Sequence, residues 1–464
     1  MSETTKEPKE LNPFVLLTFM VIVAALLTYV VPAGKFKREA DPSSGKVLVV
    51  KDSYQPIEQT PVKIQDVFLA FPNGMVAAGI LIFGMFVAGG AFRILEDMGT
   101  INAFINFLVG LVKGREIMLI PVVMAAFAIG GTAGIISPVI IFMPLGLVIT
   151  RSLGFDSMVA MGMVYLGVYA AFDTSPVVPT SVGIAHQIGQ IPLFSGAGPR
   201  SIICLTTIIS SIAYVSWYAL RVKKDPSKSL VKDINAKFDF DIKLESSRKM
   251  TQRDWLVLGV TTLSILALVV GSVKYQWEFM EISALFIFMA IVTGLVGGMS
   301  VNATAESFVK GMAGITNGAM IIGFAYAVQY VLNKGNILDT IIFHLSNVLV
   351  GLSPSLAAIS MFFVNCFSAF LITSGSGQAA AVMPIMYPIG DLLGVTRQVS
   401  AQAFLFADGF MNGLSPTSGM LMAALAIAKV PFGRWLKFHI PLFLIWVVIA
   451  IVSLVLGVHF HWGP

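Results

Sequence analysis

The chain has 464 residues, of which 56% are apolar and 12% charged, and its mean hydropathy is +0.85. Soluble domains carry about twice that charged fraction. The apolar residues form long uncharged blocks, which excludes a soluble enzyme, a disulfide scaffold and a disordered chain. The composition therefore indicates an all-α polytopic membrane protein. Its only cysteines, Cys204 and Cys366, lie in apolar segments, so no Cys/His spacing indicates a metal site.

The net charge of +5 is spread unevenly along the chain. Ten of the thirty Lys and Arg residues fall between Arg221 and Arg253. Acidic residues interleave with them, so nucleic acid is not an expected partner. The positive-inside rule instead places the 221–254 loop in the cytoplasm.

Apolar segments in chain order predict the crossings. The stretch 13–32 is too long for a signal-peptide core and is predicted to be an uncleaved first helix with a cytoplasmic N-terminus. Further crossings of the first half are expected near 73–95, 100–113, 116–130, 156–190 and 199–220. Those of the second half are expected near 255–273, 280–298, 308–332, 337–351, 355–372, 398–429 and 433–459. Two of them, 100–113 and 337–351, are short for a bilayer that needs about 20 residues.

Two pieces interrupted by Gly, Ser and Pro, 131–152 and 373–393, are predicted to be re-entrant hairpins. Thirteen crossings then remain in the sequence. Because the 221–254 loop is placed inside, the C-terminus lies outside. The polar 33–66 loop, with its six Lys and Arg residues, also lies outside in this orientation.

An internal repeat relates the two halves of the chain. Phe71-x-x-Gly74-Met75 recurs as Phe308-x-x-Gly311-Met312, and such matches are offset by 236 to 244 residues. We therefore divide the chain into a first half (1–220, repeat one at about 71–220), the 221–254 loop, and a second half (255–464, repeat two at about 308–460). Each repeat holds five predicted crossings and one hairpin. An odd number of crossings inverts the second copy, and inverted repeats are typical of secondary transporters.

Four segments gather Gly, Pro, Ser and Thr at membrane depth: two hairpin tips, 130–138 and 373–378, and two helix breaks, 173–181 and 412–418. Irregular backbone is tolerated there only if it is buried in protein or lines a polar cavity. The predicted substrate-binding residues are Gly131, Thr132, Ser137, Asp173, Thr174, Thr180, Ser374, Gly375, Ser376, Gln378, Asp408, Asn412 and Thr417. Freed carbonyls and hydroxyls also predict one Na⁺ site per repeat, formed by Thr132 with Ser175 and by Ser376 with Ser415, and no other cofactor is expected.

Asp173 and Asp408 are the sharpest single signals, since both lie in apolar crossings beside the breaks. No Lys or Arg lies near either of them in sequence, and an ionised carboxylate is costly there without a partner. A bound cation, a proton or a hydroxyl network must stabilise them. The alternative for Asp173 is a helix cap. Three basic residues at predicted segment ends are interpreted as topology determinants: Arg151, Arg397 and Lys429.

Several motifs carry a family resemblance, above all Gly89-Gly90-Ala91-Phe92, the stretch Thr373-Ser374-Gly375-Ser376-Gly377-Gln378-Ala379-Ala380, and Asp408-Gly409-Phe410 followed by Pro416-Thr417-Ser418. They resemble the YfcC family of the C4-dicarboxylate anaerobic carrier (DcuC-like) group in the ion transporter superfamily. The resemblance covers about residues 11 to 450. It implies a scaffold domain and a transport domain, elevator-type alternating access, a homodimer, and a multi-pass location in the bacterial cell membrane.

The first hairpin departs from the pattern of that family. Members similar to YfcC and to arginine/ornithine antiporters carry an acidic Gly-Met-x-Glu-Glu element where residues 134–138 here read Gly-Ile-Ile-Ser-Pro. This difference favours a carboxylate substrate over a cationic amino acid. The predicted function is a non-enzymatic secondary transporter of a small, C4-dicarboxylate-like carboxylate, coupled to Na⁺ or H⁺ or running as an exchanger, among membrane lipids. An amino-acid or peptide carrier remains the alternative, whereas an ion channel or an intramembrane enzyme is disfavoured.

Overall fold

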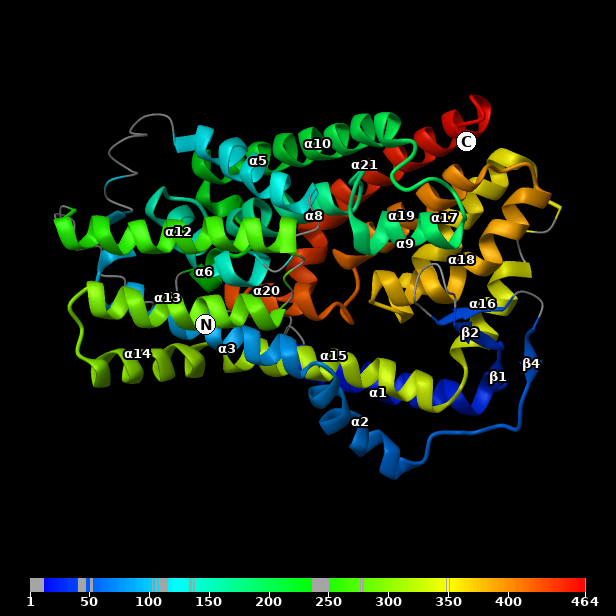
Figure 1. Cartoon of the computed structure of the whole chain (residues 1–464), viewed down its shortest axis with the longest axis horizontal. Helices are drawn as coiled ribbons and strands as arrows, with labels where there is room; N and C mark the ends of the chain where they lie inside the picture. The colour runs from blue at the N-terminus through cyan, green and yellow to red at the C-terminus, as the bar shows by residue number, and fades with distance from the viewer. Residues whose placement is uncertain are drawn as a thin grey trace, which may run out of the picture.

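The computed structural model describes residues 12–40, 47–50, 53–101, 103–104, 107, 116–132, 136, 138–235, 250–275, 277, 279–347, 349 and 351–463. This part of the chain is nearly all helical (Figure 1). The first half contains α1 (Pro13–Val30), α2 (Ile64–Ala77), α3 (Gly79–Asp97), the 3₁₀ turn η1 (Glu116–Met118), α5 (Leu119–Thr132), α6 (Pro138–Ser152), α7 (Ser157–Met161), the π-helical turn η2 (Gly162–Leu166), α8 (Gly167–Phe172), the π-helical turn η3 (Pro179–Gly183), α9 (Ile184–Ile188) and α10 (Ala197–Lys224).

The loop after α10 contains the 3₁₀ turn η4 (Pro226–Lys228) and α11 (Lys232–Asn235). The second half contains α12 (Gln252–Tyr275), α13 (Phe279–Val296), α14 (Val301–Gly314), α15 (Thr316–Lys334), α16 (Leu338–Asn347), α17 (Pro354–Leu371), α18 (Gly375–Leu392), α19 (Arg397–Asn412), α20 (Gly419–Ala428) and α21 (Phe432–His459).

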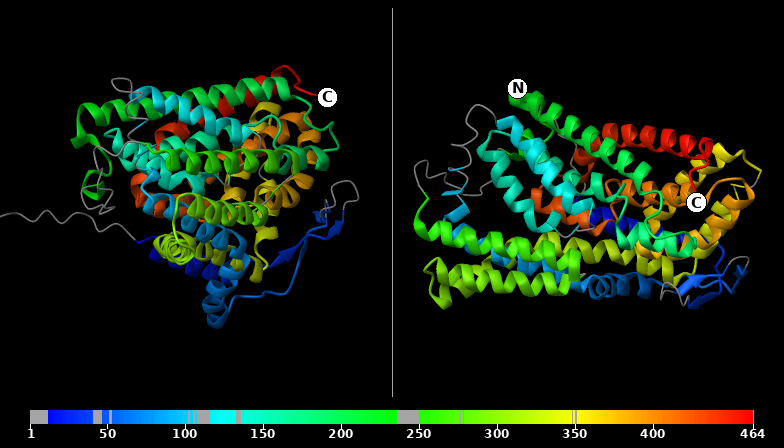
Figure 2. Two further views of the ribbon diagram at one scale, coloured as in Figure 1. Left: turned by 60° about the vertical axis from the view of Figure 1, so that its left-hand side comes forward. Right: turned by 45° about the horizontal axis from the view of Figure 1, so that its top comes forward.

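The helices form two layers (Figure 2). In the first layer α2 and α1 pack against α15, and α3 packs against α13 and α14. The second layer contains α5–α10 and α16–α21, which supply most of the largest hydrophobic core. The layers meet mainly where α15 packs on α20, and again where α3 packs on α6. The irregular segments singled out in the sequence all belong to the second layer.

The order of elements repeats between the two halves. Helices α2 and α14 both have 14 residues, α3 and α15 both have 19, and α10 and α21 both have 28. Between them, α5 and α6 correspond to α17 and α18, and the broken helix α7–α9 corresponds to α19–α20. Because α2 packs on α15 while α3 packs on α14, the bent pairs α2–α3 and α14–α15 lie side by side and run antiparallel.

Glycines allow these bent pairs to cross closely. A Cβ added to Gly311 in α14 would lie 2.3 Å from the carbonyl oxygen of Gly89 in α3. In the corresponding place, a Cβ on Gly74 would lie 2.3 Å from the carbonyl oxygen of Gly323 in α15. Small residues at such crossings let membrane helices pack backbone against backbone. The first layer is therefore held by two repeat-related glycine contacts.

Five described helices are long and apolar enough to cross a membrane, namely α1, α3, α10, α17 and α21, or six spans if α14 and α15 count as one. The predicted crossings 73–95 and 308–332 each prove to be parts of two helices, which break at Ala78 and Ile315. The predicted crossing 337–351 contains α16, whose 10 residues make a helix of about 15 Å, too short to span a bilayer. Most of 100–113 lies outside the described residues.

The prediction that 131–152 and 373–393 are re-entrant hairpins is wrong, because each piece holds one continuous helix. Helix α18 runs unbroken through Pro384 and Pro388, and α6 runs through Pro144. Membrane helices tolerate proline where neighbouring groups satisfy the freed backbone. In the second piece the Gly/Ser-rich residues begin the helix, because Ser374 caps it by accepting from the N–H of Gly377 at 3.3 Å. The chain turns between α17 and α18, which pack against each other.

The polar 33–66 loop, for which no strand was predicted, contains two antiparallel pairs of short strands. Strand β1 (Gly34–Lys35) pairs with β4 (Gln55–Pro56), and β2 (Arg38–Ala40) pairs with β3 (Val47–Val49). Arg38 forms a bidentate ion pair with Asp339 of α16, at 2.8 and 2.6 Å. The loop is thus fastened to the second half of the chain.

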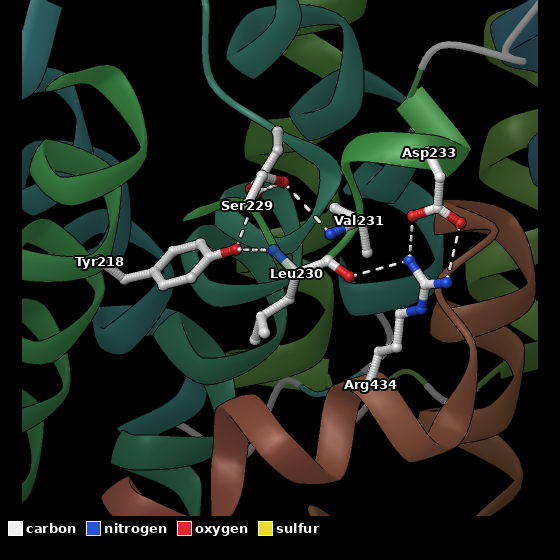
Figure 3. A network of polar contacts seen from close by, with 7 residues as sticks. Tyr218, Ser229, Leu230, Val231, Asp233 and Arg434 are labelled. Carbon is white, nitrogen blue, oxygen red and sulfur yellow. Dashed lines mark hydrogen bonds and ion pairs between the residues drawn. The ribbon is translucent and has the colours of Figure 1, made fainter. Parts of the chain in front are cut away.

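The start of the 221–254 loop is docked on the ends of α7, α10 and α21 (Figure 3). Asp156, the N-cap of α7, accepts hydrogen bonds from Tyr218 at 2.8 Å and from Ser229 at 2.6 Å. Arg434 of α21 forms a bidentate ion pair with Asp233. The loop therefore lies on the same side of the molecule as the end of α6, which only residues 153–155 separate from Asp156.

The glycine crossing predicts a local stability effect. Gly311→Ala should lower the free energy of unfolding by about 1–3 kcal/mol, because its Cβ meets backbone that cannot move aside. Gly314→Ala, at the end of the same helix, should be neutral or slightly stabilising, because a Cβ there meets nothing within 4 Å. Thermal unfolding of the detergent-purified variants measures both effects. Equal unfolding temperatures for the two variants would contradict the crossing.

Candidate functional site

Both predicted helix breaks are confirmed. The first separates α8 from η3 at residues 173–178, and the second separates α19 from α20 at residues 413–418. Asp173 directly follows α8, and Asp408 lies in the last turns of α19. Both side chains are buried, at 4% and 6% exposure. The fold thus places one buried carboxylate beside each break.

The two carboxylates come together around Gly409. A Cβ on Gly409 would lie 2.4 Å from Cγ of Asp173, so Asp173 packs directly on the residue that follows Asp408. The ion pairs of the described residues include neither aspartate. Their mutual repulsion and their burial both disfavour two ionised carboxylates. A proton or a bound cation is therefore needed to stabilise the acidic pair, by which we mean Asp173 and Asp408.

The N-terminus of α18 faces this pair. A Cβ on Gly375 would lie 2.4 Å from Oδ2 of Asp408, so the carboxylate rests against the first turn of the helix. The first N–H groups of an α-helix have no intrahelical partner, and the N-terminal end carries a partial positive charge. The start of α18 is therefore suited to hold negative charge, either that of Asp408 or that of an anion beside it.

Hydroxyl groups connect each helix break to the end of a neighbouring helix. Ser175 donates to the carbonyl of Thr132 at the end of α5, at 2.7 Å. Thr417 donates to the carbonyl of Phe370 near the end of α17, at 3.0 Å. The two halves thus make equivalent contacts at equivalent places. Of the predicted ion-binding pairs, Thr132 and Ser175 are brought together.

In the second half the hydroxyls are arranged differently from the predicted pair. Ser376 lies 3.3 Å from the hydroxyl of Ser374, whereas Ser415 is hydrogen-bonded to Thr417. The hydroxyls nearest to the second break are therefore those of Ser415 and Thr417. Ser374 and Ser376 instead belong to the start of α18.

Several other predicted site residues hold the backbone in place. Thr174 donates to the carbonyl of Ala170, and Asn412 donates to that of Asp408, both at 2.9 Å. Gln378 donates to the carbonyl of Asn365 at 2.8 Å and so joins α18 to α17. Three predicted positions remain to be placed: Gly131 packs against the carbonyl of Val168, Ser137 lies outside the described residues, and Thr180 is described only by its backbone in η3.

Two tyrosines beside the acidic pair were missed in the sequence. Tyr165 and Tyr169 stack with ring centroids 4.4 Å apart, and Tyr165 donates to the carbonyl of Asn412 at 2.8 Å. The carbonyl of Tyr169 accepts a hydrogen bond from the N–H of Asp173 at 3.0 Å. The signal available was two tyrosines four residues apart, on one face of an apolar segment that leads into a break.

A buried histidine beside the second break was also missed. His439 of α21 is fully buried, and a Cβ on Gly413 would lie 2.4 Å from its Nε2. Its ring stacks on Trp435, with centroids 5.0 Å apart. An ionisable residue inside the apolar segment 433–459 was the available signal.

Comparison with known proteins gives the family. A family model described as C4-dicarboxylate anaerobic carrier matches residues 12–459. The chain belongs to this family. It is therefore a multi-pass membrane protein of a transporter family, in keeping with its long apolar helices.

Two relatives extend over the whole chain. It is 31% identical over 491 residues to the protein named "Putative basic amino acid antiporter YfcC" of Escherichia coli (strain K12). The matched region covers 97% of each protein. It is 28% identical over 509 residues to a Haemophilus influenzae protein named "Uncharacterized protein". The matched region covers 99% of each protein. Among solved structures it is similar to the Alcanivorax borkumensis YdaH transporter, with 14% identity, a TM-score of 0.44, and coverage of 98% of this chain and 100% of that one.

The contact between α18 and Asp408 predicts a position-specific loss of transport. Gly375→Ala should lower the transport rate roughly tenfold, which a barrier increase of about 1.4 kcal/mol would produce, because its Cβ displaces the Asp408 carboxylate. Gly377→Ala is the matched control, since its Cβ meets only Ser374 and Ile372 at ordinary contact distances of 3.4 Å or more. Uptake into proteoliposomes at equal protein content measures both. If the two variants transported equally well, the carboxylate would not depend on the start of α18.

Proposed function

We propose that the protein is a secondary active transporter of small carboxylates of the C4-dicarboxylate type, with a cation that balances the acidic pair. The observation that carries the proposal is the meeting of Asp173 and Asp408 at the start of α18, beside both helix breaks. Family membership supplies the transporter class. The first N–H groups of α18 and nearby hydroxyls would donate to a substrate carboxylate.

Charge balance requires the cation. At an effective dielectric constant of 20, two like unit charges 4 Å apart repel by about 4 kcal/mol. A carboxylate that approaches Asp408 would meet this repulsion unless Asp408 is protonated or paired with Na⁺. Binding of substrate and binding of H⁺ or Na⁺ then become linked, which is the thermodynamic basis of coupled transport.

The sites proposed for Na⁺ lie where each helix break contacts the end of a neighbouring helix, α5 in the first half and α17 in the second. The carbonyl of Thr132 and the hydroxyl of Ser175 are adjacent in the first site. In the second, the hydroxyls of Ser415 and Thr417 and the carbonyl of Phe370 are adjacent. Oxygen ligands of this kind suit an alkali cation, and unwound backbone commonly coordinates Na⁺ in transporters.

Alternating access is proposed to occur by movement of the second layer as a transport domain along the first layer as a scaffold. The antiparallel bent pairs support an inverted repeat, with the N-terminus and the 221–254 loop in the cytoplasm and a homodimer in the bacterial cell membrane. The contact between the layers is unequal: α20 and its counterpart η3–α9 both pack on elements of the second layer, but α20 also packs on α15 of the first layer. Such asymmetry is expected if the second layer lies nearer to one end of its proposed movement along the first layer.

A second candidate function is amino-acid antiport, with the acidic pair binding the ammonium or side-chain cation of the substrate. It is favoured by the absence of a basic partner for Asp173 and Asp408 among the ion pairs of the described residues. The name of the Escherichia coli relative points in the same direction. In this alternative the pair stays ionised when substrate binds.

Asp408→Asn distinguishes the two functions. For a carboxylate substrate, the variant should bind with near-normal affinity but lose the dependence of binding on Na⁺ or pH, because the charge to be neutralised is gone. For an ammonium-bearing substrate, binding should weaken by about 2–5 kcal/mol, the usual cost of removing one partner of a buried charge pair. Binding of succinate and of arginine to the purified protein, with and without Na⁺ at several pH values, measures the difference.

Asp391→Asn is the matched control, because this carboxylate is exposed and pairs with Arg397 at 2.9 Å. Such exposed ion pairs contribute little, so binding should stay unchanged. If Asp408→Asn altered neither affinity nor ion dependence for either substrate, the acidic pair would have no part in binding and the proposal would be wrong.

A further inference from the structure

A cavity of about 330 Å³ lies at the boundary between the two layers. Its walls come from α3, α6, α14, α15 and the end of α20. Five charged residues line it, of which four are basic and one is acidic: Arg93, Arg151, Lys310, Lys429 and Glu96. We call it the cationic cavity. The acidic pair is not part of its lining.

The basic residues of this cavity come from four separate elements. Arg93 lies on α3, Arg151 on the last turn of α6, Lys310 on α14, and Lys429 is the C-cap of α20. Arg93 is paired with Asp97 at 2.8 Å and with Glu96 at 3.4 Å. In the sequence, Arg151 and Lys429 were interpreted only as topology determinants at distant segment ends. The fold brings them to one cavity, where their charges add to that of Lys310.

The cationic cavity lies toward the side of the 221–254 loop. Arg151 is five residues before Asp156, which binds Ser229 of that loop. Lys429 is five residues before Arg434, which is paired with Asp233 of the same loop. Two of the basic lining residues are thus close in sequence to the points where the loop docks (Figure 3).

A second cavity of about 480 Å³ lies on the side of β1, with residues of α15, α16 and α18 in its walls. Gln329 and Asn333 of α15 line it at the places of Phe92 and Glu96 of α3, counted from the start of each 19-residue helix. Its charged residues are Lys35, Arg38 and Asp339. Since Arg38 and Asp339 pair with each other, this cavity lacks a comparable excess of positive charge.

We propose that the cationic cavity is a vestibule that binds small carboxylate anions on the loop side of the transporter. This inference rests on the proposed function, since it takes the substrate to be an anion. Clefts of one charge sign with apolar walls raise the local concentration of the opposite charge and its association rate by about 10- to 1,000-fold. The cavity on the side of β1 shares part of this frame, through α15 and α18 in place of α3 and α6, and its lining has only one more basic than acidic residue.

The test uses transport of succinate by oriented proteoliposomes, measured separately from each side. Lys310 and Lys429 are both exposed, so Lys310→Gln with Lys429→Gln should fold normally. The double variant should raise KM from the loop side roughly tenfold at low salt and leave kcat unchanged. KM from the opposite side should stay the same. The rise in KM should be smaller at 0.5 M salt. The distance over which exposed charges interact is then only a few Å, compared with roughly 8 Å at physiological ionic strength.

Two controls separate this effect from a general change of charge. Lys334→Gln removes an exposed positive charge from α15 outside the cationic cavity and should leave KM unchanged from both sides. The charge reversals Lys310→Glu and Lys429→Glu should raise the loop-side KM further than the neutral variants. An unchanged loop-side KM, or an equal rise from both sides, would overturn the vestibule while the proposed function stands. If the unaltered protein neither bound nor transported succinate but did transport arginine, the proposed function itself would be wrong, and the vestibule with it.

Discussion

The contact that the rest of the site depends on is the packing of two aspartates against glycine backbone. Asp173 rests on Gly409, and Asp408 rests on Gly375. Any side chain at either glycine would occupy the space of a carboxylate. This arrangement brings the end of α8, the start of α18 and the last turns of α19 to one point, although α8 comes from the first half of the chain and the others from the second. A buried pair of acids in apolar surroundings is costly, and the cost falls only when a cation or proton is present.

The two halves share the task of holding this point. Ser175 binds the end of α5 and Thr417 binds the end of α17, so each break is tied to the helix that precedes a tip. The first layer is held differently, by Gly311 on Gly89 and Gly74 on Gly323. Hydroxyl-to-carbonyl bonds can be exchanged for bonds to water or an ion, whereas a glycine crossing is rigid. This division would suit the proposed movement of the second layer along the first.

The sequence predicts those parts of the fold that leave a local chemical trace. Both breaks were found because Ser175-Pro176 and Ser415-Pro416 interrupt apolar segments. The bends at Ala78 and Ile315 were missed because each has only a neighbouring glycine, Gly79 or Gly314, as a local signal, and single glycines are frequent elsewhere in these apolar segments. The hairpin error had the opposite cause, since Pro384 and Pro388 look like breaks yet lie inside α18. The meeting of Asp173 with Asp408, and of Arg151 with Lys429, depends on tertiary packing that no local pattern records.

The basic residues of the cationic cavity and the acidic pair would affect transport in different ways. A basic vestibule on one side favours anions as a class, but it cannot drive their accumulation, because anion binding there is not linked to the binding of a cation. In the proposed mechanism the acidic pair has the reverse character: it disfavours an anion until a cation is bound, and so it links the two binding events. Selectivity for charge would then come from Arg151, Lys310 and Lys429, and coupling from Asp173 and Asp408. Because these groups lie on different elements and the aspartates do not line the vestibule, either property can change without the other.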